Sequence, residues 1–135
     1  YRAEIVRKHL NGLEDARIIR QSFHSGENKV PLSTGVNKKA YKLFCLDVGL
    51  CYSFMGLPIA NIYSANDIND VSKGILAEQY VAQTLAALPP YHKLKVLNHW
   101  QRQKKNAQAE VDFVAALEGV IIPMECKSGY SSKMT

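Results

Sequence analysis

The sequence Glu110-Val111-Asp112-Phe113-Val114 leads through a turn at Glu118-Gly119 into Met124-Glu125-Cys126-Lys127, and this stretch decides the fold. Polar and apolar residues alternate in both arms, and successive side chains of a strand point to opposite faces. The stretch therefore predicts two strands joined by a hairpin, with Leu117 facing Val120 across the turn.

The predicted hairpin register brings charged residues together. Asp112 is expected directly across from Glu125, and Glu110 across from Lys127. Cross-strand neighbours lie ~5 Å apart at Cβ, where two carboxylates repel by roughly 3 kcal/mol at an effective dielectric near 20. Such a pair needs a cation, either a divalent metal or Lys127. The more ordinary alternative is a surface salt bridge between Glu110 and Lys127, worth under ~1 kcal/mol.

Composition indicates an ordinary globular chain with an anionic partner. The 135 residues suffice for one compact domain, and 47% apolar with 21% charged residues does not fit a disordered chain. The net charge of +5 places nucleic acid first among candidate partners.

The positive charge is concentrated in residues 91–109, which contain no acidic residue. This stretch is either a solvated loop or part of a channel for a polyanion, and its position just before the carboxylate hairpin favours the channel. Its basic residues are Lys93, Lys95, Arg102, Lys104 and Lys105.

The remaining composition favours a cytoplasmic protein. Three cysteines without metal-ligand spacing predict reduced, free thiols. No run approaches the ~18 apolar residues of a membrane span, and no P-loop is present, so we expect neither membrane insertion nor ATP binding. The chain starts at Tyr1 and ends at Thr135, from which we expect a fragment of a longer polypeptide.

Residues 1–60 predict a winged-helix-like or linker segment. Asp47 is the expected N-cap of a short helix. The expected elements are a helix over Ala3–Asn11, a strand over Ala16–Phe23, a polar turn over His24–Lys29, a loop over Pro31–Lys39, a strand over Ala40–Leu46 and a helix over Val48–Met55.

Residues 61–135 predict an α/β unit with a mixed sheet. An Asn- and Asp-rich linker over Asn61–Asp70 precedes a long helix over Val71–Leu88, which Pro89-Pro90 ends. A strand over Lys93–Trp100 comes before the hairpin. Glu78 lies on the apolar stripe of the helix, where it is either an edge residue or a third carboxylate delivered to the sheet.

Glu78, Asp112, Glu125 and Lys127 resemble the motif of the PD-(D/E)XK nuclease superfamily, which has an acid on its first helix, an Asp on its second strand and (D/E)-X-K on its third. Val111 stands where the superfamily's name has proline. The closer resemblance is to the uncharacterised C-terminal domain attached to many prokaryotic AAA-type ATPases. It covers roughly residues 40–130 and is carried in order by Tyr41–Leu50, Lys73–Gln83, Ala109–Phe113 and Ile122–Gly129.

The resemblance implies a restriction-endonuclease-like mixed sheet flanked by helices, and metal-assisted hydrolysis of phosphodiesters in DNA. Asp112 and Glu125 would hold one or two Mg²⁺ or Mn²⁺ ions with support from Glu78, and Lys127 would orient the attacking water or stabilise the phosphorane. Flanking phosphates would be bound by Arg102, Lys104 and Lys105.

The resemblance also leaves a second function open, a non-catalytic module that docks DNA or protein for an attached ATPase. Only eight residues follow Lys127, whereas the fold usually adds another strand and helix. We therefore expect a nuclease-like domain truncated at its C-terminus, which forms a partial sheet or takes a strand from a second copy in a homo-oligomer.

Overall fold

The computed structural model describes residues 2–26, 30–58, 70–88, 96–102 and 109–129. Their elements follow the chain in the order α1 (Arg2–Asp15), β1 (Ile19–Ser25), the 3₁₀ helix η1 (Leu32–Gly35), β2 (Val36–Cys45), α2 (Val48–Phe54), α3 (Asp70–Ala87), β3 (Leu97–Gln101), β4 (Glu110–Val111), β5 (Phe113–Leu117) and β6 (Val120–Met124).

A mixed sheet with helices on its faces forms the described part of the chain, which confirms the predicted α/β class. Its strand order is β2-β1-β3-β4. Strand β1 runs antiparallel to β2 and parallel to β3, and β3 runs antiparallel to β4. Strands β5 and β6 form a separate antiparallel hairpin. Residues from both halves of the chain therefore share one sheet.

The β5–β6 hairpin confirms the predicted turn. Glu118 and Gly119 both have positive φ, 50° and 82°, as the tight two-residue turns that match strand twist require. Leu117 pairs with Val120, and the register continues to Phe113 opposite Met124.

The predicted register is wrong beyond the hairpin. The chain bends at Asp112, and the preceding strand β4 pairs with β3, where Glu110 lies opposite Gln101. Glu110 is therefore not across from Lys127. Asp112 and Glu125 do not form a ladder pair either, because the β5–β6 ladder ends at Phe113.

The N-terminal elements agree with the predicted types and differ at their ends. The first helix continues past Asn11 to Asp15, and Arg17, at φ 58°, turns the chain into β1. Strand β1 includes His24, where a turn was predicted. Strand β2 begins at Val36, inside the predicted loop, because residues 36 and 37 pair with the end of β1.

The structure confirms the two other predicted helices, α2 and α3. Asp47 caps α2 by accepting a hydrogen bond from the Leu50 amide at 2.8 Å. Helix α3 matches the predicted long helix, whereas residues 61–69 of the linker and 93–95 of the next strand lie outside the described residues. In the described ranges, no helix has the length and apolar content to cross a membrane.

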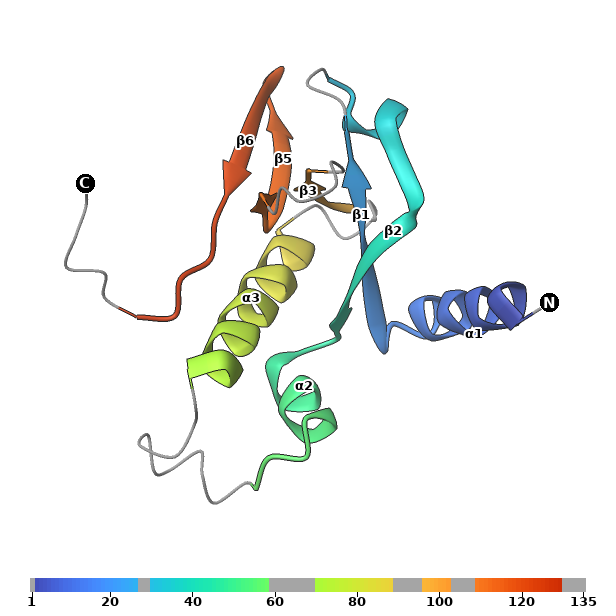
Figure 1. The fold of residues 1–135 in the computed structure, drawn as a ribbon, viewed down its shortest axis with the longest axis vertical. Helices are drawn as coiled ribbons and strands as arrows, with labels where there is room; N and C mark the ends of the chain where they lie inside the picture. The colour runs from blue at the N-terminus through green and yellow to red at the C-terminus, as the bar shows by residue number, and fades with distance from the viewer. Residues whose placement is uncertain (1, 27–29, 59–69, 89–95, 103–108, 130–135) are drawn as a thin grey trace.

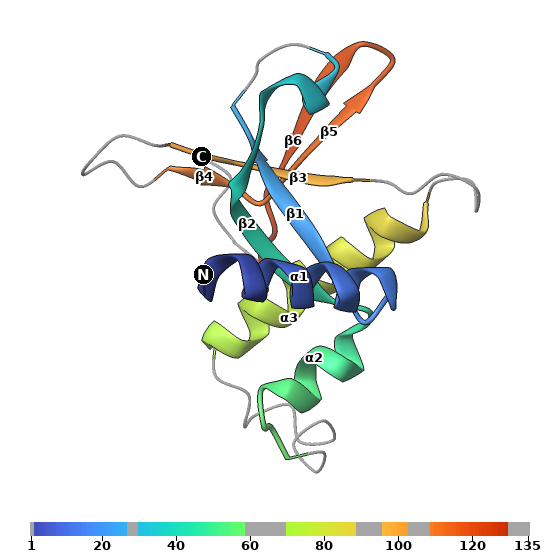
Figure 2. The same cartoon turned by 90° about the vertical axis from the view of Figure 1, so that its right-hand side faces the viewer.

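The hydrophobic core lies between α3 and one face of the sheet. It consists of Phe44, Ala82, Leu97 and Phe113, and the rings of Phe44 and Phe113 are 5.4 Å apart. Helix α1 lies on the other side of β1 and β2, so the two helices flank this strand pair from opposite faces (Figures 1 and 2).

We predict that Phe113→Ala lowers the free energy of unfolding by about 3–5 kcal/mol, the usual cost of removing a buried aromatic ring. Phe113 is 1% exposed. The matched control is Leu117→Ala on the same strand, which is 62% exposed and should change stability by no more than about 0.5 kcal/mol. Urea unfolding of both variants measures the difference, and equal losses would contradict this description of the core.

Candidate functional site

Lys42 lies among three carboxylates at the sheet. Its Nζ is 2.7 Å from Glu78 Oε1 and 3.4 Å from Asp112 Oδ1, and it also forms an ion pair with Glu110. The acids come from α3, β4 and the bend between β4 and β5, whereas Lys42 comes from β2. Four separate segments therefore place one ammonium and three carboxylates together, and we call this group the Lys42 cluster.

Two glutamine side chains of α3 fix the helix against the end of β2 and the start of α2. The side-chain amide of Gln79 accepts from the Cys45 amide at 2.8 Å and donates to the Cys45 carbonyl at 3.0 Å, as a neighbouring strand would. Gln83 accepts from the Val48 amide at 2.7 Å. Because Gln79 directly follows Glu78, this contact holds the Glu78 carboxylate beside β2.

Partial burial makes the Lys42 cluster electrostatically significant. The side chains of Lys42, Glu78 and Asp112 are 24%, 25% and 18% exposed. Burial alone lowers the pKa of Lys42, but hydrogen bonds and charge attraction from Glu110 and Glu78 outweigh it and hold the pKa above its ordinary range. Lys42 is therefore protonated at neutral pH.

The second oxygen of Asp112 reaches the segment that follows β6. Asp112 Oδ2 accepts a hydrogen bond from the Cys126 amide at 2.9 Å. Burial, together with the charge of Asp112, raises the pKa of the Cys126 thiol to about 11, so this thiol stays protonated. The contact brings the backbone of the Glu125-Cys126-Lys127 triplet to the edge of the Lys42 cluster.

Glu125 and Lys127 form a second, more exposed pair. Lys127 Nζ is 3.1 Å from Glu125 Oε1, and the two side chains are 72% and 51% exposed. The structure thus brings Glu78 and Asp112 together with Glu110, whereas Glu125 and Lys127 pair beside them. Lys42 is the cation that contacts the clustered carboxylates, a position for which the sequence analysis did not consider it.

One feature of the sequence could have indicated that Lys42 belongs to this site. Strand alternation places Lys42 and Phe44 on the same face of β2, and Phe44 is buried in the core. A lysine on the core-facing side of a strand requires a partner.

The donor chemistry of the Lys42 cluster fits a hard divalent cation, because carboxylate oxygens are the preferred ligands of Mg²⁺. Among the residues that the structure describes, however, no three acidic, histidine or cysteine side chains are arranged as a metal site. A divalent ion would therefore take the position that Lys42 holds between Glu78, Glu110 and Asp112.

A buried polar group lies next to the Lys42 cluster on β1 and β3. Ser22 Oγ is 3.3 Å from His99 Nδ1, and the His24 and His99 rings are 5.9 Å apart. His24 Nδ1 accepts from the Gln101 amide at 3.2 Å, which places its proton on Nε2. Burial, with the charge of Lys42, lowers the pKa of His99 to about 4.

Of the three residues predicted to bind phosphate, Arg102 alone lies in the described part of the chain. Arg102 is exposed at the end of β3, and its amide donates to the Ala109 carbonyl at 2.8 Å. Lys104 and Lys105, like Lys93 and Lys95, lie outside the described residues.

Residues 73–135 match a domain of unknown function (DUF4143). The matched segment contains Glu78, Glu110 and Asp112, whereas Lys42 precedes it. No curated protein and no solved structure gave a significant match.

We predict that His99 makes the protein less stable as the pH falls from about 6.5 to about 4. The folded-state pKa is depressed, so the unfolded chain binds a proton that the folded chain does not. Stability from neutral His99 is complete above pH ~6.5 and falls by up to about 1.4 kcal/mol per pH unit towards pH 4. Unfolding in urea at pH 7, 6 and 5 measures this slope.

The His99→Gln variant should show a shallower pH slope, whereas His9→Gln, on the exposed surface of α1, should keep the slope of the wild type. Equal slopes for the wild type and His99→Gln would show that His99 does not carry this dependence.

Proposed function

We propose that this chain carries a metal-dependent nuclease-like domain of the PD-(D/E)XK type, which hydrolyses phosphodiester bonds in DNA. The observation that supports it best is the convergence of Glu78, Glu110 and Asp112 from three segments on one cation position. Three carboxylates that converge on one position repel one another, so their convergence favours a site that binds a cation.

The proposed ligands of Mg²⁺ or Mn²⁺ are Asp112, Glu78 and Glu125, and Glu110 joins them on the evidence of its contact with Lys42. A bound divalent ion would polarise the scissile phosphate and acidify a water molecule. Asp112 has one oxygen towards the cation position while the Cys126 amide fixes the other, so its carboxylate is already oriented.

The lysines have separate tasks in this proposal. Lys42 would keep the carboxylates together in the absence of a divalent ion, and once such an ion is bound the ammonium would be available to the phosphate charge. Lys127 is exposed beside Glu125, where it can orient a water or contact the phosphate. Arg102, Lys104 and Lys105 would bind flanking phosphates without reading the base sequence.

The wider context belongs to the same proposal. The mixed sheet with α3 on one face is compatible with a restriction-endonuclease-like fold. We propose that the domain works in the cytoplasm, attached to an AAA-type ATPase module that lies outside this sequence.

A non-catalytic docking module is the second candidate, and a specific observation favours it. The Lys42 ammonium already contacts all three carboxylates, so each of them has an ionic partner without a metal. In that case the carboxylates and Lys42 stabilise the fold, and the domain binds DNA or protein without cleaving it.

We predict that the chain cleaves DNA in the presence of Mg²⁺ or Mn²⁺ and that Asp112→Asn lowers the rate at least about 100-fold. Asn is nearly the same size and still accepts the Cys126 hydrogen bond, so the loss would reflect the charge and not the fold. The assay follows labelled single-stranded, duplex and branched DNA, with circular dichroism to verify folding.

The matched control is Glu4→Gln, which removes one carboxylate from the exposed face of α1 and should leave cleavage unchanged. Equal cleavage by the wild type and Asp112→Asn would refute the nuclease assignment. DNA binding in EDTA with no product after addition of metal would support the docking module instead.

A further inference from the structure

A cleft separates α1 from β1 and β2, on the face of this strand pair opposite the Lys42 cluster. Its volume is about 910 Å³. Tyr41 lines the cleft, whereas its neighbour Lys42 contacts Glu78 of α3, as strand alternation requires. The cleft is therefore a separate site from the carboxylates, although both are built on β2.

The cleft is open because α1 is fastened near its C-terminal end. Glu14 accepts hydrogen bonds from the Gln21 amide at 3.0 Å and from Gln21 Nε2 at 2.6 Å, and Asn11 contacts the same side chain. Along the rest of the helix no side chain is fully buried, and Val6 is 52% exposed even though it lines the cleft.

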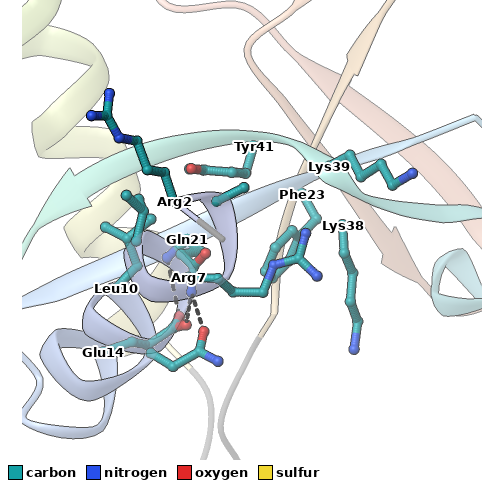
Figure 3. Close-up of a pocket in the computed structure, with 12 residues that line it drawn as sticks. Arg2, Arg7, Leu10, Glu14, Gln21, Phe23, Lys38, Lys39 and Tyr41 are labelled. Atoms are coloured by element: carbon teal, nitrogen blue, oxygen red, sulfur yellow. Dashed lines mark hydrogen bonds between the residues drawn. The ribbon is translucent and has the colours of Figure 1, made fainter.

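The cleft has an apolar floor and cationic walls (Figure 3). Phe23 and Tyr41 provide aromatic rings from β1 and β2, and Val6 and Leu10 add aliphatic surface from α1. Cations come from both walls: Arg2 and Arg7 from α1, and Lys38 and Lys39 from β2.

Charge complementarity identifies the chemistry of the occupant. Among the described residues that line the cleft, Glu14 is the only one with a carboxylate, and this carboxylate is engaged by Gln21. Four cations around aromatic rings suit a ligand that carries repeated negative charge and flat apolar groups. Single-stranded nucleic acid has both, because phosphates contact basic walls while bases stack on aromatic side chains.

We propose that this cleft binds single-stranded nucleic acid, with the phosphates along Arg2, Arg7, Lys38 and Lys39 and a base against Tyr41 or Phe23. An acidic peptide would satisfy the cations but not the aromatic floor, and an intact duplex keeps its bases stacked inside. This binding needs no divalent ion and does not depend on hydrolysis at the Lys42 cluster.

The test measures the fluorescence anisotropy of a labelled oligothymidylate of about ten nucleotides in EDTA and ~0.15 M salt. Arg7→Glu, and Lys39→Glu on the opposite wall, should each weaken binding about tenfold. Tyr41→Leu, which keeps an apolar side chain but no ring to stack on, should weaken it roughly fivefold or more.

Lys8→Glu is the matched control, because it makes the same charge change on the same helix but lies on the other face of α1, outside the cleft. It should weaken binding less than about threefold at this salt concentration. Melting temperatures verify that each variant folds. Equal losses for Arg7→Glu and Lys8→Glu would show that net charge alone drives binding and would overturn the proposal.

Two further outcomes would assign the cleft to another occupant. Displacement of the oligonucleotide by polyglutamate at equal charge concentration would indicate an acidic peptide site. Self-association that Arg7→Glu abolishes would indicate a second copy of the chain. Asp112→Asn separates this proposal from the nuclease proposal, because it should lose cleavage and keep oligonucleotide binding.

Discussion

The ion pairs of Lys42 are the interaction on which the arrangement of the candidate site depends. They join β2 to α3, to β4 and to the bend before β5, through Glu78, Glu110 and Asp112. Glu78 and Asp112 are partly buried and Glu110 is exposed, so mutual repulsion and the burial of two charges disfavour the three carboxylates unless a cation lies among them. The cluster therefore ties the placement of the N-terminal strands to that of the segments that carry the motif.

The two faces of strand β2 contact different parts of the molecule. One face packs Phe44 into the core and presents Lys42 to the carboxylates, whereas the other presents Tyr41 and Lys39 to the cleft under α1. Because β2 is an edge strand, the cleft and the Lys42 cluster both lie at the same edge of the sheet, on its opposite faces. A nucleic acid strand held in the cleft would thus lie on the strand that also borders the proposed catalytic site.

The sequence predicted those parts of the fold that depend on interactions between residues close together in the chain. The periodicity of α3, the cap at Asp47 and the turn at Glu118-Gly119 depend on residues close in sequence, and all three are confirmed. The length of β2 was underestimated, because residues 36–39 look like a polar loop until β1 provides a partner for its first residues.

The candidate site was only partly predictable, since its arrangement is not local. Glu78 and Asp112 do meet, but the cation between them comes from Lys42, which precedes Asp112 by 70 positions. The expected pairing of Asp112 with Glu125 assumed an uninterrupted hairpin. The chain bends at Asp112 so that β4 can pair with β3, and no spacing within the motif indicates that choice.

The most direct test of this account is a calorimetric titration of Mn²⁺ into the wild type, Asp112→Asn and Lys42→Gln. If the carboxylates are a cation site that Lys42 occupies in the absence of metal, the wild type binds Mn²⁺ and Asp112→Asn does not. Lys42→Gln should then bind at least as tightly as the wild type, because the competing ammonium is gone. Absence of binding in both the wild type and Lys42→Gln, or undiminished binding in Asp112→Asn, would contradict it.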